Sequence, residues 1–186
     1  MGGNHIDEER LEREMTSYQI RLDERTEECY QLAGKARSKG LDHSLEVEIP
    51  RANDLAGRTE KLLVDHLDGL EIAGDIRTML KEFENDRETT AIKIAQKVAQ
   101  EFKQRGASTV KSIDVGLRVG LAVLTEAVLV APLEGISEVR LLHNLDGSPF
   151  VSVHFAGPIR AAGGTAQALA VLIADMIRRD LNIGPY

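Results

Sequence analysis

The sequence predicts an α+β protein that is mostly α, in which a helical arm and a helical bundle precede a β-hairpin, a Gly-rich loop and a final helix. Two patterns support this class: apolar residues recur at helical spacing through most of residues 7–130, and two strand-like segments joined by a turn signal follow Pro132. The composition, 42% apolar and 28% charged, is typical of a globular protein. Because only 4% of the residues are aromatic and none is Trp, we expect an aliphatic core.

These patterns divide the chain into three parts. Residues 1–44 are expected to form an N-terminal helical arm, residues 45–132 a helical domain with a short edge strand, and residues 133–186 a β-hairpin plus a helix. Since one hairpin and one helix make a thin unit, we expect the third part to be the start of a larger domain that truncation has cut.

The arm is predicted to be one helix over residues 7–39, which Gly40 ends. Its apolar residues form a narrow, heptad-like stripe between charged residues. Such a stripe is too narrow to form a core alone, so we expect the arm to dock on the rest of this chain or to pair with another chain. The stripe comprises Leu11, Met15, Tyr18, Leu22, Cys29, Ala33 and Ala36, of which the first four are the candidate assembly residues.

The second part begins with residues 45–49, which alternate strictly up to Pro50 and predict a short edge strand or an extended connector. Asn53 or Asp54 is suited to cap a following helix that runs to about Leu67. Three further helices are predicted over residues 70–83, over 88–105, and from Ser112 or Asp114 to Val130. The last is apolar nearly all round, which is typical of the central helix of a bundle.

In the third part, strands are predicted over residues 138–145 and 150–155, joined by a turn at 146–149. A Gly-rich loop, Ala156-Gly157-Pro158-Ile159-Arg160-Ala161-Ala162-Gly163-Gly164-Thr165, leads into an apolar helix over residues 166–181.

This loop is the most informative segment of the sequence. Free backbone N–H groups at Gly163 and Gly164 before a helix favour an anion, and Arg160 is suited to add a charge-assisted contact to a phosphate, beside Thr165. The loop lacks the Gly-Lys-Ser/Thr of a Walker A loop and the Rossmann glycine spacing. The alternative is that the glycines only permit a tight turn, with backbone angles closed to other residues at Gly163 and Gly164.

A second candidate for phosphate contact is a basic stripe on the helix over residues 88–105. Lys93 and Lys97 share one face of that helix with Gln100 and Gln104, and Arg105 lies at its end. A solvated helix surface explains the same residues at least as well.

No catalytic residue and no metal site is predicted. His143 and His154 are expected on the same face of the hairpin if its loop has four residues, but a zinc site needs further ligands that the nearby sequence lacks, so ordinary strand histidines are the simpler interpretation. The acidic clusters fall on predicted helix surfaces and ends.

The charge pattern bears on partners and location. The net charge is −7, and residues 1–60 hold 14 acidic and nine basic residues, which disfavours a stand-alone DNA-binding protein. The lone Cys29 and the charged first 30 residues indicate a reducing, cytoplasmic setting without a secretory signal. No membrane span is expected, because the most apolar stretch, residues 115–133, contains Arg118, Glu126 and Pro132.

The segment from Val151 to Leu169 closely resembles the N-terminal region of the large subunit of the archaeal D-family DNA polymerases (DNA polymerase II large subunits). The similarity extends to residues 30–40, 46–50 and 140–147, and thus spans most of the chain. The acidic residues 1–15 carry little of it.

The resemblance implies a replicative, DNA-directed DNA polymerase whose small subunit carries a proofreading 3′–5′ exonuclease. It also implies that the metal-binding aspartates of nucleotidyl transfer, with Mg expected, lie in a double-psi β-barrel downstream of these residues. This part is therefore expected to be inactive by itself and to hold no cofactor. The partners it implies are primer–template DNA, the small subunit and the remainder of the large subunit, with self-association as a further option.

Two alternatives stay open at this point. The chain is also interpretable as a purely structural helical oligomerisation module with no DNA affinity, or as a nucleotide-binding enzyme that uses the Gly-rich loop.

Overall fold

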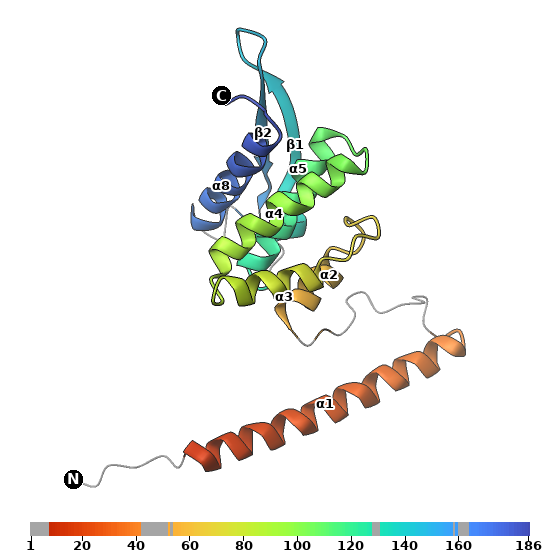
Figure 1. Cartoon of the computed structure of the whole chain (residues 1–186). Coiled ribbons are helices and arrows are strands. Elements are labelled where there is room, and N and C mark those ends of the chain that lie inside the picture. The colour runs from red at the N-terminus through yellow and green to blue at the C-terminus, as the bar shows by residue number, and fades with distance from the viewer. Residues whose placement is uncertain (1–7, 42–51, 53, 128–130, 158, 160–163) are drawn as a thin grey trace, which may run out of the picture. The chain divides into compact units, whose positions relative to one another are not determined.

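The structure, a computed structural model, describes residues 8–41, 52, 54–127, 131–157, 159 and 164–186. The chain divides into two compact units, Met1–Glu48 and Ile49–Tyr186. The described residues are mostly helical, with one two-stranded antiparallel hairpin, which confirms the predicted α+β class (Figure 1).

The first unit contains one long helix, α1 (Glu8–Ser38), as predicted for the arm. Ion pairs one turn apart, Arg10–Glu14 (2.9 Å) and Arg25–Glu28 (2.7 Å), lie along its surface. The helix ends where Gly40 adopts a φ of +69°, a left-handed conformation that glycine reaches without strain. The Leu41 N–H then donates to the Ala36 carbonyl at 3.0 Å.

The second unit begins with α2 (Leu55–Leu62) and α3 (Ala73–Glu82). Asp54 caps α2 by accepting a hydrogen bond from the Gly57 N–H at 2.8 Å, as predicted. No side chain of its own turn caps α3; instead Glu60 of α2 accepts from the N–H groups of Ile72 (2.7 Å) and Ala73 (2.8 Å). Helix α2 is shorter than predicted, and the predicted strand over residues 45–49 and Asn53 lie outside the described residues.

The centre of this unit is the pair α4 (Arg87–Gln104) and α5 (Thr109–Leu124). Every residue of α5 from Val115 to Val123 is buried, which confirms its prediction as the central helix. The predicted start at Ser112 or Asp114 is wrong, because Ser108 caps the helix by accepting from the Lys111 N–H at 3.2 Å. The predicted continuation to Val130 is also wrong: α5 ends at Leu124, and Glu126 and Ala127 have positive φ.

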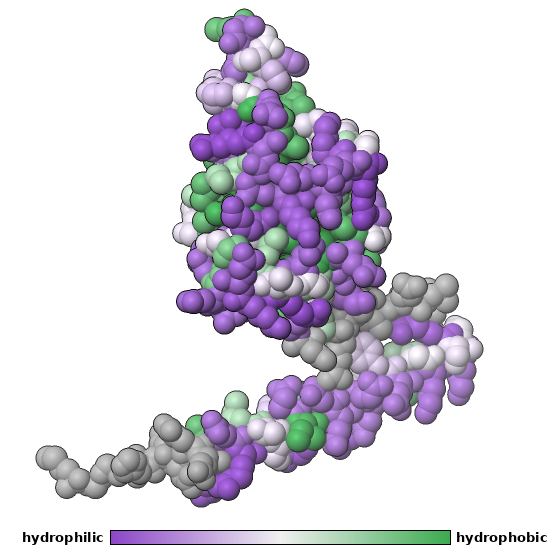
Figure 2. All heavy atoms as spheres, viewed as in Figure 1, coloured by the Kyte–Doolittle hydropathy of each residue, from purple (hydrophilic) through white to green (hydrophobic). Residues whose placement is uncertain are grey.

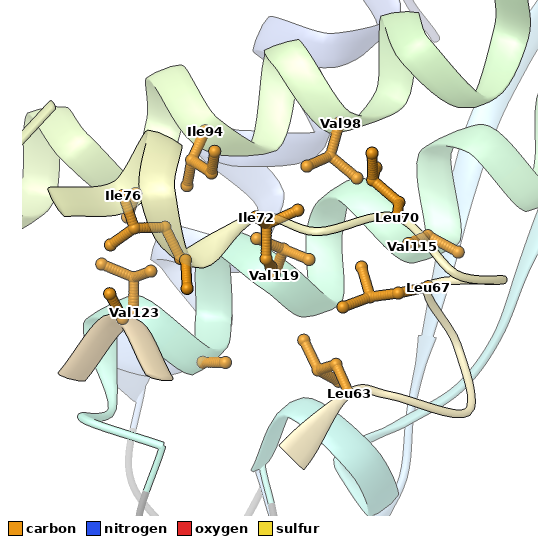
Figure 3. Packing of buried hydrophobic residues seen from close by; sticks show 14 of the residues in the cluster. Leu63, Leu67, Leu70, Ile72, Ile76, Ile94, Val98, Val115, Val119 and Val123 are labelled. Carbon is orange, nitrogen blue, oxygen red and sulfur yellow. The ribbon is translucent and has the colours of Figure 1, made fainter. Parts of the chain in front are cut away.

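Two aliphatic clusters pack on opposite sides of α5. Figure 3 shows the first, in which side chains of α3, α4 and α5 meet, among them Ile76, Ile94 and Val119. The second joins α4 and α5 to the hairpin and the last helix, and includes Leu117, Ile173 and Ile177. The expected aliphatic core is thus present, with Phe102 as its one buried aromatic residue among those that the structure describes.

The remaining elements are the short α6 (Ala131–Glu134), β1 (Ile136–His143), β2 (Pro149–Phe155) and α8 (Gly164–Asp180). Strands β1 and β2 pair antiparallel, with His143 opposite Pro149 and Glu138 opposite His154. Helix α8 packs on α4, α5 and β2. Residues on both sides of position 132 thus share the second cluster, while the three-part domain division stays a prediction.

Candidate functional site

The first candidate surface is the apolar stripe of α1. Leu11, Met15, Tyr18 and Leu22 lie four, three and four residues apart, and their exposed fractions range from 45% to 62%. Figure 2 shows hydrophobic side chains at the surface of α1 among its many polar ones. A row of large apolar side chains that its own helix leaves uncovered is typical of an interaction surface rather than of a core.

The predicted basic stripe of α4 is divided by its contacts. Lys93 and Arg105 are exposed, and neither forms an ion pair with any residue that the structure describes. Lys97 instead lies 2.6 Å from the Asp75 carboxylate of α3. The two cations left for a phosphate are therefore separated by most of the length of the helix.

The Gly-rich loop is described only in part. Gly164 and Thr165 are exposed in the first turn of α8, whereas Arg160 and Gly163 lie outside the described residues. The expectation of a restricted backbone is wrong for Gly164, because its φ is not positive and a Cβ there would meet nothing within 4 Å. The helix begins at this residue, so an ordinary helical backbone suffices.

The predicted juxtaposition of the two histidines is wrong. The hairpin loop has five residues, since Asn144 leaves the strand and its N–H donates to the Ser148 carbonyl at 2.9 Å. The turn spans 144–148 instead of the predicted 146–149, because Asn144 and Leu145 leave the predicted strand and Pro149 joins β2. This register turns His143 and His154 to opposite faces, near opposite ends of the hairpin. Within the described ranges, no three His, Cys, Asp or Glu residues lie close enough together to hold a metal ion.

A small polar cluster lies on the face of the hairpin that carries His154. Glu138 pairs with Arg140, and this guanidinium holds the pKa of the Glu138 carboxyl below its usual value. The Ser152 hydroxyl lies 3.3 Å from Nε2 of His154. These groups satisfy one another and leave no ligand set for a cation.

Arg118 is an important residue whose role the sequence analysis did not assign. It is 6% exposed, and its guanidinium donates to the backbone carbonyls of Pro132 (2.9 Å), Leu133 (2.5 Å) and Ile136 (3.0 Å). Its Nε also lies 3.1 Å from the Asp114 carboxylate one turn before. The sequence does contain a signal for this role: Arg118 is a lone arginine in an apolar helix, and an aspartate that could pair with it lies four residues earlier.

His66 lies near this buried charge. Burial lowers the pKa of His66, and the positive charge of Arg118 acts in the same direction. Both effects favour the neutral imidazole.

The second feature that the sequence analysis missed is an apolar groove between β2 and α8, with a volume of about 340 Å³. Val151 and Val153 of β2 line one side, and Val171 and Ala174 of α8 line the other. The paired Asp175 and Arg178 (2.5 Å) lie at its polar side. Only the strand pairing and the packing of α8 bring these residues together.

Comparison with known proteins identifies the family. Residues 17–186 match the model described as "DNA polymerase II large subunit DP2, N-terminal". The chain belongs to this family. The match covers the second unit and the first unit from residue 17 onward, and it confirms the resemblance found in the sequence.

Individual DNA polymerase II large subunits agree with this assignment. The chain is 51% identical to that of Picrophilus torridus over 95% of its own length and 16% of the relative's. It is 45% identical to that of Methanothermobacter thermautotrophicus over 92% and 15%, and 41% identical to that of Pyrococcus furiosus over 95% and 14%. The chain thus spans about one-sixth of the length of these relatives or less. None of its described helices is long and apolar enough to cross a membrane.

Proposed function

We propose that this chain is the non-catalytic N-terminal module of a replicative, DNA-directed DNA polymerase large subunit and that it acts in subunit assembly. The partners in this proposal are the remainder of the large subunit and a small subunit that carries a 3′–5′ exonuclease, in the cytoplasm. The proposal assigns Mg and nucleotidyl transfer to other parts of the polymerase.

The apolar stripe of α1 carries the assembly proposal. Leu11, Met15, Tyr18 and Leu22 follow the spacing of a coiled-coil seam on a helix of 31 residues. A partner that covers these four side chains removes their apolar area from water. Such burial contributes roughly 25 cal/mol of favourable free energy per Å² of apolar surface. The charged residues beside the stripe keep α1 soluble and add specificity to the choice of partner.

Two exposed apolar residues of α1 make a matched test. Leu22 lies in the stripe, whereas Ile20, which is 53% exposed, lies outside it. We expect Leu22→Glu to abolish the association of the chain with itself or with the other polymerase subunits in analytical ultracentrifugation, and Ile20→Glu to preserve it. Equal behaviour of the two variants would contradict the role of the stripe.

DNA contact is the second role in this proposal. Exposed Lys93 and Arg105 are available to phosphates, as are Gly164 and Thr165 at the start of α8, and Arg160 and Gly163 are included from the sequence. Lys97 is the weakest of the predicted contacts, because its ion pair with Asp75 would have to be given up.

Fluorescence anisotropy with a labelled primer–template at several salt concentrations tests this role. We expect Arg160→Ala and the double variant Lys93→Ala/Arg105→Ala each to weaken binding and to flatten its salt dependence, because fewer counterions are released. Lys61→Ala, at an exposed lysine of α2, is the charge-matched control for Arg160→Ala. Lys61→Ala/Lys81→Ala, which also removes an exposed lysine of α3, is the control for the double variant. Absence of binding at low salt would instead favour a purely structural assembly module.

A further inference from the structure

The hairpin has an open edge beside the apolar groove. Among the described residues its sheet has only two strands. Along an antiparallel pair of strands, hydrogen-bonded residue pairs alternate with pairs that are not hydrogen-bonded to each other. The bond between the Asn144 N–H and the Ser148 carbonyl (2.9 Å) makes this a hydrogen-bonded pair, so the pairs Leu141–Val151 and Val139–Val153 are of the other kind. The N–H and C=O groups of Val151 and Val153 therefore point away from β1, along the outer edge of β2.

The same two residues direct their side chains into the groove. Val151 and Val153 face α8, where Val171 is 54% exposed and lies with Ala174 on the opposite wall. Unpaired backbone groups and apolar side-chain pockets thus occur side by side. This is the combination with which a sheet edge binds an added strand: the main chain supplies hydrogen bonds, and alternate side chains enter the pockets.

We propose that a β-strand from the remainder of the large subunit adds to the outer edge of β2 and places apolar side chains in the groove against α8. The inference rests on one part of the proposed function, that this chain is a module of a longer large subunit. It goes beyond that function because it states where the docked segment binds and that the segment binds as a β-strand.

The length of the relatives favours this occupant over a free partner. The matched region is N-terminal in the family and makes up 14–16% of the three relatives compared, so most of their polypeptide lies outside it. Pro185 and Tyr186 line the groove, so a polypeptide that continues past them starts beside it. A segment on the same chain binds at a high effective concentration, which compensates for a small groove.

Hydrogen–deuterium exchange tests the proposal in two proteins: this chain alone, and a chimera in which it replaces the matching region of the Picrophilus torridus large subunit. We expect the Val151 and Val153 amides to exchange about tenfold more slowly or better in the chimera, because a new strand covers them. Equal exchange in the two proteins would overturn the proposal. Slow exchange in the chain alone that depends on its concentration would also overturn it, and would assign the edge to a second copy.

Two neighbouring residues of α8 provide the matched variants. Val171 lines the groove, whereas Leu172 is 44% exposed and does not. In the chimera we expect Val171→Asp to restore fast exchange at Val151 and Val153 and Leu172→Asp to leave these amides protected, while both variants of the isolated chain keep its unfolding temperature. Protection that survives Val171→Asp would show that the strand does not use the groove. Neither result depends on α1 association or DNA affinity, so failure here is distinct from failure of the proposed function.

Discussion

Arg118 connects three elements through its side chain alone. It extends from α5 to carbonyls at the end of α6 and the start of β1, where the chain passes from helices to the hairpin. These carbonyls lie at element ends, where backbone groups lack partners. Only an arginine supplies several donors in a fixed planar arrangement, so the residue is tied to this geometry rather than to charge alone.

We expect Arg118→Met to destabilise the chain by about 3 kcal/mol or more, because it leaves Asp114 without its partner and three carbonyls without donors. Arg179→Met is the control, since Arg179 is exposed and pairs with Asp175 at the surface, where a pair is worth at most about 1 kcal/mol. Urea unfolding measures both. Similar losses for the two variants would show that the buried contacts add nothing.

The helix caps predict a dependence of stability on pH. The hydrogen bond from Arg77, followed by that from the Gly57 N–H, lowers the pKa of Asp54 below 3.8, and bonds from Thr89 lower that of Asp86. The unfolded chain therefore binds more protons near this pH than the folded chain. The stabilisation of the folded chain by the two ionised carboxylates is fully present well above pH 3.8. It is lost as the pH falls through the lowered pKa values that Asp54 and Asp86 have in the folded chain.

We expect the double variant Asp54→Asn/Asp86→Asn to lose stability less steeply than the natural chain between about pH 5 and pH 3, because Asn caps a helix without titrating. Thermal unfolding at a series of pH values measures the slope. An unchanged slope would assign the acid sensitivity to other carboxylates.

At the scale of elements, the contact between α4 and α5 depends on the absence of side chains. A Cβ on Gly116 would lie 2.6 Å from the Ala95 carbonyl oxygen, and one on Gly120 would lie 3.0 Å from that of Ala91. Small residues on both helices bring the two backbones close together. Helix α8 packs over the same place, since Cδ1 of Ile177 would lie 3.1 Å from a Cβ on Gly116.

We expect Gly116→Ala to destabilise the chain by about 2 kcal/mol, since a backbone carbonyl cannot move aside as a flexible side chain can. Gly164→Ala is the matched control: it is also a helical glycine, but its Cβ would meet open space, so the change is expected to be neutral or to stabilise by less than about 1 kcal/mol. Denaturant midpoints measure both. A stability loss at Gly164 as large as that at Gly116 would contradict this account of the contact.

At the scale of the whole molecule, the chain is two units with separate sources of stability. Every described core residue belongs to the second unit, from Ala56 to Ile183, while Leu11, Met15, Tyr18 and Leu22 of α1 are exposed. The second unit therefore has a core of its own. The first is a single helix that contributes no residue to the described core.

We expect a chain that starts at Ile49 to fold and to unfold within about 2 °C of the full chain, because every described core residue lies in the second unit. Circular dichroism during heating measures the midpoint. The same truncation is expected to abolish the association that Leu22→Glu abolishes. A large drop in the unfolding temperature would show that α1 stabilises the second unit.

Sequence patterns predicted the helices of α1, α3, α4 and α8 to within a few residues, because their apolar periodicity and most of their end signals are local. The Asp54 cap and the buried character of α5 were predictable for the same reason. The family, too, followed from a continuous segment. Local residues are enough where a structure depends on neighbours three or four positions apart.

Only the tertiary structure decided the hairpin register, the role of Arg118 and the groove beside β2. Asn144 and Leu145 lie in the loop instead of the predicted strand, and Pro149 lies in β2; the resulting register separates two histidines that a four-residue loop at 146–149 would have placed on one face. Arg118 meets carbonyls 14 to 18 residues later, and the walls of the groove lie about 20 residues apart. Such contacts form when elements pack against one another, and no local spacing in the chain encodes them.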